Sequence, residues 1–424
     1  MNLKKITDYL LVRIVIAIIL GIIAAWIFGI NDNKPGLVIA RIFTTFSGLF
    51  SNFLGFFVPV LIFALITPAI ASLGRGAGKW LGITTAIAYG STIISGFIAY
   101  ALSQALYPSL LAGNARAEVG DISEGALEPY FSIEMPAPLD VMTALLLAFT
   151  IGVAMTAVKS DTLYEGAKDL QRVIMKVIAK FIIPLLPIYI FAVFMGLGMN
   201  GKLLDTISAF AKVIVLAIVM TWVILLLQYL AAGAYTGKNP FKAIGNMLPA
   251  YATALGTSSS AATIPVTYAS ALKNGISEKV AGFVIPLCAT IHLSGSMQKI
   301  ALFAFAIVFM DGMDISFGQA IGFVLMLGIF MIAAPGVPGG AIMAAVGLLQ
   351  SSLGFDESQV ALMIAAYIAI DSFGTACNVT GDGAIALVVN KLAKGTIERG
   401  GTLDEHSELD YQTEEPPFED EILK

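Results

Sequence analysis

The sequence predicts an all-α membrane protein with eight transmembrane helices and two re-entrant helical hairpins arranged as inverted repeats. Three observations support this fold class. Of 424 residues, 58% are hydrophobic and only 12% are charged, whereas a soluble domain carries about 25% charged residues. Apolar runs of roughly 18 residues or more, the length of a membrane-spanning helix, recur from Leu10 to Val389. Two further apolar runs are interrupted by Gly, Ser and Pro.

The predicted spans are long apolar runs with almost no charge. In chain order they are Leu10–Phe28, Ile42–Ala71, Leu81–Leu106, Val141–Val158, Val173–Met195, Ile207–Ala232, Val280–Met310 and Val360–Val389. Lysines precede the first run, as in a signal peptide, but no clear small-residue cleavage site follows it. We therefore expect this run to be retained as the first span. An even number of spans places both termini on the same side of the membrane.

The two interrupted stretches are Phe241–Leu272 and Phe317–Leu353. Their middles read GTSSS at residues 256–260 and PGVPGG at residues 335–340. Irregular backbone at membrane depth is tolerated only where protein or a water-filled cavity surrounds it. Most Lys and Arg residues of the short connections fall on one face if the first stretch enters and leaves from the cytoplasm. We therefore predict two re-entrant hairpins that approach the midplane from opposite faces, an arrangement typical of secondary transporters.

Much of the acidic charge lies outside the spans. Residues 108–140 are predicted to form an extracellular loop, and residues 396–424 an acidic cytoplasmic tail. The net charge is −5, and no basic surplus indicates a nucleic-acid partner. Two cysteines are too few for a disulfide scaffold or a four-cysteine zinc site.

The last predicted span carries a polar stripe. Asp371, Thr375, Asn378 and Asp382 follow at spacings of four, three and four residues, so they lie within about 60° of one another on a helix. In the C-terminal spans only His292 and Lys299 offer basic partners. We expect the two carboxylates to be satisfied instead by a bound cation and a bound ammonium group. Pairing with the two basic residues, as contacts between helices, is the structural alternative.

The seventh predicted span also contains polar residues. His292, Ser296 and Lys299 are expected to share a face, and Gly295 permits a local break whose carbonyls suit a small monovalent cation. His292 is either a packing residue or a proton carrier. The serine triplet Ser258–Ser260 and the glycine-rich break offer backbone N–H groups at helix N-termini, where a carboxylate is held favourably. A simple turn is the alternative for the triplet.

An enzyme is disfavoured by geometry. Three helical turns separate Asp371 from Asp382, about 16 Å at roughly 1.5 Å per residue, which is too far for an aspartyl pair to share a proton. An ion channel or a sensor is the more distant alternative, and conductance without substrate would indicate it.

Four segments carry a resemblance to a known family. SSSAATIP at 258–265, PLCATIHLSG at 286–295, GVPGG at 336–340 and the stripe from Asp371 to NVTGD at 378–382 resemble the dicarboxylate/amino acid:cation symporter family, the glutamate-transporter homologues. The likeness covers nearly the whole chain. Details of the site also look like the bacterial serine/threonine:sodium symporters. The resemblance implies an inner (plasma) membrane protein with several spans, embedded in the lipid bilayer as a homotrimer.

The resemblance also implies a division into domains. Residues 1–72 and 141–200 would be scaffold helices. Residues 73–107 and 201–395, with hairpins 241–272 and 317–353, would form a transport domain that moves across the membrane.

Carried over position by position, the resemblance implies a substrate site and cation sites. Asp371 would hold the α-ammonium group of an amino acid, and Asp382 would bind sodium with carbonyls of Asn378 and Cys288. The implied substrate-binding residues are Ser258, Ser259, Ser260, Thr290, Val337, Pro338, Gly339, Asp371, Gly374, Thr375 and Asn378. The implied cation ligands are Tyr89, Thr92, Cys288, His292, Ser294, Asn378 and Asp382.

Two departures from the family pattern shape the expected function. Acid-specific members place an arginine at the position of Gly374 or Ser258, and this chain has neither. Because an unpaired buried carboxylate costs several kcal/mol, we expect sodium-coupled symport of a small neutral amino acid of the serine, threonine or alanine type. The alternative is sodium- or proton-coupled symport of dicarboxylates or acidic amino acids. The family's Asn-Met-Asp-Gly-Thr run is HLSGS at 292–296, which removes an asparagine and a carboxylate from the cation sites and leaves room for a proton.

Overall fold

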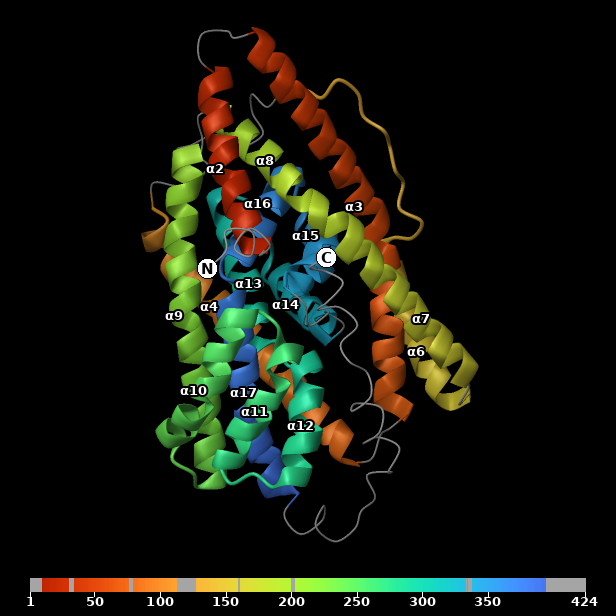
Figure 1. The fold of residues 1–424 in the computed structure, drawn as a ribbon, viewed down its shortest axis with the longest axis vertical. Coiled ribbons are helices and arrows are strands. Elements are labelled where there is room, and N and C mark those ends of the chain that lie inside the picture. Colours follow the sequence, from red (N-terminus) through yellow and green to blue (C-terminus); the bar gives the residue numbers. More distant parts are fainter. Residues whose placement is uncertain are drawn as a thin grey trace, which may run out of the picture.

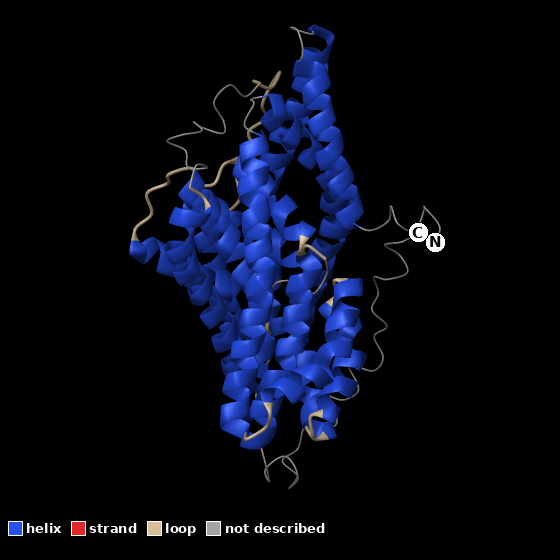
Figure 2. Cartoon of the chain, turned by 90° about the vertical axis from the view of Figure 1, so that its left-hand side faces the viewer, coloured by secondary structure: helices blue, strands red, loops and turns tan. Residues whose placement is uncertain are grey.

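The computed structural model is helical throughout the part of the chain that it describes, with loops but no strand between the helices (Figure 2). This confirms the predicted all-α class. The structure describes residues 10–29, 34–75, 79–112, 127–158, 161–199, 203–332, 334 and 338–393. The acidic tail, part of the predicted outer loop and Val337 lie outside these residues.

Figure 1 shows how the helices are arranged. The first part of the chain contains α2 (Leu10–Gly29), α3 (Lys34–Arg75), α4 (Lys79–Leu110), α6 (Val141–Val158), α7 (Asp161–Val177), the π-helical turn η1 (Ile178–Ile182), α8 (Ile183–Met199) and α9 (Leu203–Thr236). The second part contains α10 (Pro240–Thr257), α11 (Ser260–Lys273), α12 (Glu278–Ile291), α13 (Ser294–Met310), α14 (Phe317–Ile332), α15 (Gly340–Leu353), α16 (Glu357–Ala369) and α17 (Asp371–Leu392).

The helices pack in two groups. In one, α2 lies against α8, and α3 lies against α6, α7 and α8. In the other, α10, α11, α12 and α13 surround α17, and α4 and α9 pack against α13 (Figure 1). The second group contains elements expected in the transport domain, whereas α15 and α16 also contact α2, α3 and α8. The division into domains and the movement of one past the other stay predictions.

Helix length and composition support several membrane crossings. Among the described residues, five helices are long and apolar enough to span a bilayer: Pro35–Ala71, Lys79–Leu110, Asp161–Met199, Ile207–Thr236 and Glu278–Met310. Helices α16 and α17 would form a sixth crossing, bent by 60° at Ile370. The first and fourth predicted spans correspond to the shorter apolar helices Val12–Phe28 and Thr143–Val158. The count of eight therefore stays a prediction.

Both interrupted stretches form helix pairs with the break in the expected place. Helix α10 ends at Ser258, whose φ of 50° is left-handed, and Ser259 caps α11 by accepting a hydrogen bond from Ala262 N. Helix α15 begins after Gly339, whose φ is 74°. In each pair the two helices pack against each other. Their re-entrant insertion into the membrane stays a prediction.

The described end of the predicted outer loop runs along α3 (Figure 1). Arg41 Nε donates to Glu128 O at 2.8 Å, and Asn52 Nδ2 donates to Ile133 O at 2.9 Å. The Arg41 guanidinium also lies 4.6 Å from the centre of the Tyr130 ring. These contacts fasten residues 127–140 to one long helix.

Candidate substrate and cation site

Interruptions in three helical stretches lie along α17, two of them at its N-terminus and one beside its middle. The seventh predicted span breaks at His292 and Leu293, between α12 and α13. The eighth breaks at Ile370, which caps both α16 and α17. Gly339, at the break of the second helix pair, reaches the first residue of α17 through its backbone N–H. Such breaks free backbone groups for ligands in a membrane protein.

Asp371 is the first residue of α17 and is 6% exposed. Its Oδ2 accepts a hydrogen bond from Gly339 N at 2.8 Å. Its Oδ1 lies 3.4 Å from Lys299 Nζ. The carboxylate is therefore held by a hairpin break on one side and by a lysine of α13 on the other.

Lys299 is fully buried. Besides Asp371 Oδ1, its Nζ donates to the carbonyls of Ile370 at 3.2 Å and Asp371 at 3.4 Å. It also lies 3.9 Å from the centre of the Tyr367 ring, a distance at which an ammonium group is attracted to the π face. The cation thus has four favourable contacts in the protein interior.

Gly374 makes room for this lysine. A Cβ atom built on Gly374 would lie 2.3 Å from Lys299 Cε and 2.4 Å from Lys299 Nζ. These distances are too short for non-bonded atoms, so the ammonium lies where a side chain at position 374 would begin. The close approach of α13 to α17 continues at Gly295, whose added Cβ would be 2.5 Å from Gly374 O.

Asn378 bridges the same two helices. Its Oδ1 accepts from Gly295 N at 2.7 Å, and its Nδ2 donates to Ser296 Oγ at 3.2 Å. Thr375, one turn before Asn378, donates from Oγ1 to Asp371 O at 3.2 Å. The predicted polar stripe is therefore buried and directed into the bundle.

Asp382 lies deeper along α17 and is fully buried. Its Oδ1 is 2.8 Å from His292 Nδ1. On the other side of the imidazole ring, Nε2 lies 3.1 Å from Ser91 Oγ. Gln228 Nε2 donates to Ser91 Oγ at 2.9 Å and to Ser294 Oγ at 3.0 Å. The break at His292 thus connects α17 to α4 and α9.

Three buried oxygens at or beside this network have no hydrogen-bond partner. They are Asp382 Oδ2, Thr380 Oγ1 and Gln228 Oε1. Buried polar atoms are normally satisfied, and carboxylate, hydroxyl and amide oxygens are the hard ligands that alkali and alkaline-earth cations prefer. Asp382 Oδ2 is a buried carboxylate oxygen without a partner, which favours a small cation beside Asp382.

The pairing of both acids corrects one expectation. The carboxylates were expected to lack basic neighbours, but Lys299 contacts Asp371 and His292 contacts Asp382. His292 also does not share a helix face with Lys299, because His292 ends α12 and Lys299 belongs to α13. The structural alternative, pairing of the acids with basic residues of another helix, is therefore present. Asp382 Oδ2 still has no hydrogen-bond partner and can accept a ligand.

The other expected cation ligands are distributed unevenly. Thr92 Oγ1 accepts from Leu293 N at 3.2 Å, which places it at the break. Cys288 O accepts from His292 N at 2.9 Å as a helix cap. The Tyr89 ring, by contrast, lies against Gly328 of α14.

Several of the expected substrate residues make hydrogen bonds within their own helix or are exposed. The Ser259 side chain caps α11, and Ser260 follows as its buried first residue. Thr290 is exposed and donates to Leu287 O at 2.8 Å within α12. Pro338 is exposed beside Gly339. Gly339 therefore contacts Asp371 through its backbone N–H, whereas the described hydrogen bond of Thr290 lies within its own helix.

The sequence profile of the Sodium:dicarboxylate symporter family matches residues 10–392. The chain belongs to this family. Excitatory amino acid transporter 1 of Rattus norvegicus is 34% identical over 180 residues, which are 41% of this chain and 33% of that protein. Excitatory amino acid transporter of Caenorhabditis elegans is 27% identical over 297 residues, 69% of this chain and 59% of that protein.

A further relative is Excitatory amino acid transporter 3 of Mus musculus, 36% identical over 163 residues, 38% of this chain and 31% of that protein. The matches thus span about a third of the mammalian relatives' length. The symporter family and its named relatives are transporters and not enzymes. Together with the apolar helices, they identify the chain as a multi-pass protein of the plasma membrane.

Sequence reasoning missed several residues of the candidate site. Ser91 and Gln228 contact His292, Ser95 Oγ donates to Ser294 O at 2.9 Å, and Tyr367 lies under the Lys299 ammonium. Gln228 is the single amide side chain in the predicted span Ile207–Ala232, which is a signal that sequence inspection could have used. The contact of Tyr367 with Lys299 depends on how α13 meets the α16–α17 bend and has no such signal.

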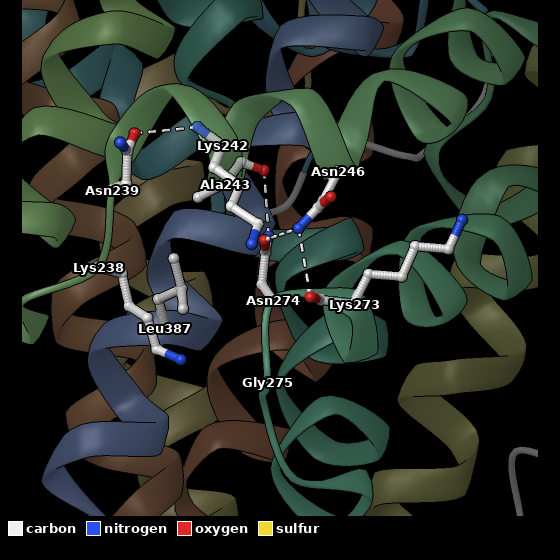
Figure 3. A pocket seen from close by; sticks show the side chains of 9 residues that line it. All are labelled: Lys238, Asn239, Lys242, Ala243, Asn246, Lys273, Asn274, Gly275 and Leu387. Atoms are coloured by element: carbon white, nitrogen blue, oxygen red, sulfur yellow. Dashed lines mark hydrogen bonds between the residues drawn. The ribbon is translucent and has the colours of Figure 1, made fainter.

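A separate polar cavity lies at the open end of the first hairpin (Figure 3). Its volume is about 210 Å³, and its lining residues are Lys238, Asn239, Lys242, Ala243, Asn246, Lys273, Asn274, Gly275 and Leu387. Asn246 Nδ2 donates to Asn274 Oδ1 at 2.8 Å, and Asn274 Nδ2 donates to Ala243 O at 3.1 Å. These bonds tie α10 to the turn after α11.

Proposed function

We propose that the chain is a cation-coupled symporter of a small amino acid. The observation that carries this proposal is the position of Asp371, a buried carboxylate at the meeting point of a hairpin break and the first turn of α17. A carboxylate in this place can accept the α-ammonium group of an amino acid. The N-termini of α11 and α15 offer backbone N–H groups for the α-carboxylate.

The coupling cation is proposed to bind beside Asp382. The carboxylate is buried, and its Oδ2 has no hydrogen-bond partner, in common with Thr380 Oγ1 and Gln228 Oε1. Sodium is the first candidate, because a carboxylate offers hard oxygen ligands and the matching profile is that of a sodium symporter family. A proton is the alternative coupling ion, and an imposed pH gradient without sodium distinguishes the two.

The charge of the substrate's side chain is the next point, because it separates a neutral from an acidic amino acid. A small neutral amino acid was expected because no arginine stands at position 258 or 374. Lys299 weakens that reason, since its ammonium occupies the space beside Gly374. An acidic amino acid is therefore the second candidate function, favoured by this cation and in keeping with the names of the relatives.

Thermal-shift measurements test the proposal. We would measure the unfolding temperature of the purified protein with each proteinogenic amino acid, in sodium buffer and in choline buffer. Because a ligand stabilises the folded state that binds it, we expect a shift that needs both one group of amino acids and sodium. Serine or alanine as the strongest ligand supports the neutral substrate, and aspartate or glutamate supports the acidic one. A protein that no amino acid stabilises under any cation condition would contradict the proposed function.

A further inference from the structure

We propose that Lys299 is an internal counter-cation for Asp371, which neutralises the substrate site when it is unloaded and lets the empty transporter return without binding a cation from solution there. The proposal rests on the proposed function, because it takes Asp371 to be the acceptor of the substrate's ammonium group. A symporter must move its site back across the membrane without substrate in each cycle, so the charge of the empty site matters.

The starting point is the cost of a buried charge. Asp371 is 6% exposed and lies at the start of a helix in an apolar bundle. An uncompensated carboxylate at membrane depth is expensive. Lys299 is fully buried and is attached to α13, which packs against α17. Its charge therefore accompanies Asp371 wherever these two packed helices go.

The geometry also allows the lysine to yield to a substrate. Lys299 Nζ is 3.4 Å from Asp371 Oδ1, longer than the roughly 2.7–2.9 Å of a tight charge-assisted hydrogen bond. If an ammonium group of the substrate takes Oδ1, Lys299 keeps its contacts with Ile370 O at 3.2 Å and with the Tyr367 ring at 3.9 Å. The lysine can remain in place in both states.

The surroundings of the second acid, Asp382, differ from those of Asp371. The basic neighbour of Asp382 is His292, which is a cation only when protonated, and Asp382 Oδ2 has no hydrogen-bond partner. Asp371 has the amine of a lysine on one oxygen and the Gly339 N–H on the other. The fold thus supplies a built-in cation at the substrate carboxylate and leaves the deeper carboxylate for an ion from solution.

This arrangement predicts a specific defect in Lys299→Gln. Exchange of labelled for unlabelled substrate passes only through loaded states, whereas net uptake requires return of the empty site. Without the lysine, the empty site carries an unpaired carboxylate and its return is slowed. We expect the ratio of net uptake to exchange to fall by at least about tenfold relative to wild type. Lys299→Arg keeps the positive charge but is bulkier at this packed site, so it should lower the yield of folded protein. In the protein that folds, its ratio of net uptake to exchange should stay within about twofold of the wild-type ratio.

The measurement uses the full-length protein in proteoliposomes and the amino acid that stabilises it most. Net uptake is measured into vesicles without substrate, and exchange into vesicles with equal sodium and unlabelled substrate on both sides. Lys242→Gln is the control, because Lys242 is an exposed lysine at the open end of the first hairpin, and it should leave both rates unchanged. A Lys299→Gln variant that keeps the wild-type ratio, or that loses exchange and net uptake equally, would overturn the proposal.

Wild-type protein provides a test that does not depend on the folding of a variant. Its net uptake should be the same, within about twofold, when the vesicle interior contains potassium or choline, because the counter-charge is already present in the protein. Net uptake that requires potassium inside would show that solution supplies the cation and would overturn the proposal. Absence of both exchange and uptake for every amino acid would instead refute the proposed function.

Discussion

Gly374 lets the Lys299 ammonium lie directly against α17, so we expect Gly374→Ala to displace it. The added Cβ would meet Lys299 Cε at 2.3 Å, so the end of the lysine has to move and loses contacts to Asp371 and Tyr367, at a cost of about 1–3 kcal/mol. The variant should therefore have a lower unfolding temperature and a weaker response to substrate. Gly322→Ala on α14 is the matched control: no atom lies within 4 Å of its Cβ position, so it should be neutral or stabilising by up to about 1 kcal/mol.

Asp382 gives a second prediction for a single residue. Asp382→Asn keeps the size of the side chain and removes the charge that we assign to cation binding. We expect the sodium concentration for half-maximal stabilisation to rise at least about tenfold, because one buried charge-assisted contact is lost. The measurement is a sodium titration of the unfolding temperature. The exposed Asp314 provides the control, Asp314→Asn. Wild-type sodium affinity in Asp382→Asn would remove Asp382 from the cation site.

The sequence predicted the polar residues of α17 better than their partners. A helical period places Asp371, Thr375, Asn378 and Asp382 on one face, and the structure buries all four. The contact between Asp371 and Lys299 was only the alternative interpretation of the sequence. It depends on the break at Ile370 and on the absence of a side chain at position 374, and a period along one helix carries no information about a neighbouring helix.

At the scale of elements, we predict that both ends of the first hairpin lie on the same side of the membrane. If α10 and α11 form a re-entrant pair, Lys242 near the start of α10 and Lys273 at the end of α11 lie on the same side of the membrane. We expect Lys242→Cys and Lys273→Cys, both exposed positions, to react with a membrane-impermeant maleimide from the cytoplasmic side only. The native Cys288 and Cys377 are fully buried and should react little.

Glu134→Cys is the control for the opposite face. Glu134 is exposed in the segment that runs along α3, which is predicted to be extracellular, and it should react from outside. Labelling of positions 242 and 273 from opposite sides would mean that the stretch crosses the membrane fully and would refute the re-entrant hairpin.

Helix positions were largely predictable, and the differences have a simple cause. The fifth predicted span begins at Val173, but the helix begins at Asp161, because the amphipathic α7 is too polar to be marked by hydropathy. Helix α3 likewise begins at Lys34, before the apolar run at Ile42. Hydropathy detects the part of a helix in contact with lipid, whereas backbone hydrogen bonding continues beyond it. The breaks at Ser258 and Gly339 were predictable because Ser, Gly and Pro interrupt apolar runs there.

At the scale of the whole molecule, the oligomer is a prediction from family resemblance. Apolar side chains are exposed along α2 and α3, including Ile19, Trp26, Val38 and Ile42. Such a surface can face lipid or another copy, because lipid tails are as apolar as these side chains. We expect native mass measurement in mild detergent to give three copies. A monomer that retains full amino-acid binding would contradict the homotrimer.

Driven uptake by the whole protein tests the central claim most directly, which is that Asp371 and Asp382 couple an amino acid to a cation. The measurement is accumulation of labelled amino acid in proteoliposomes under an inward sodium gradient, for wild type and for Asp371→Asn. We predict that wild type accumulates substrate above the external concentration and loses it when an ionophore dissipates the gradient. Asp371→Asn should remain folded and accumulate none. Equal accumulation by Asp371→Asn and wild type, or uptake by wild type that is indifferent to every cation gradient, would contradict the claim.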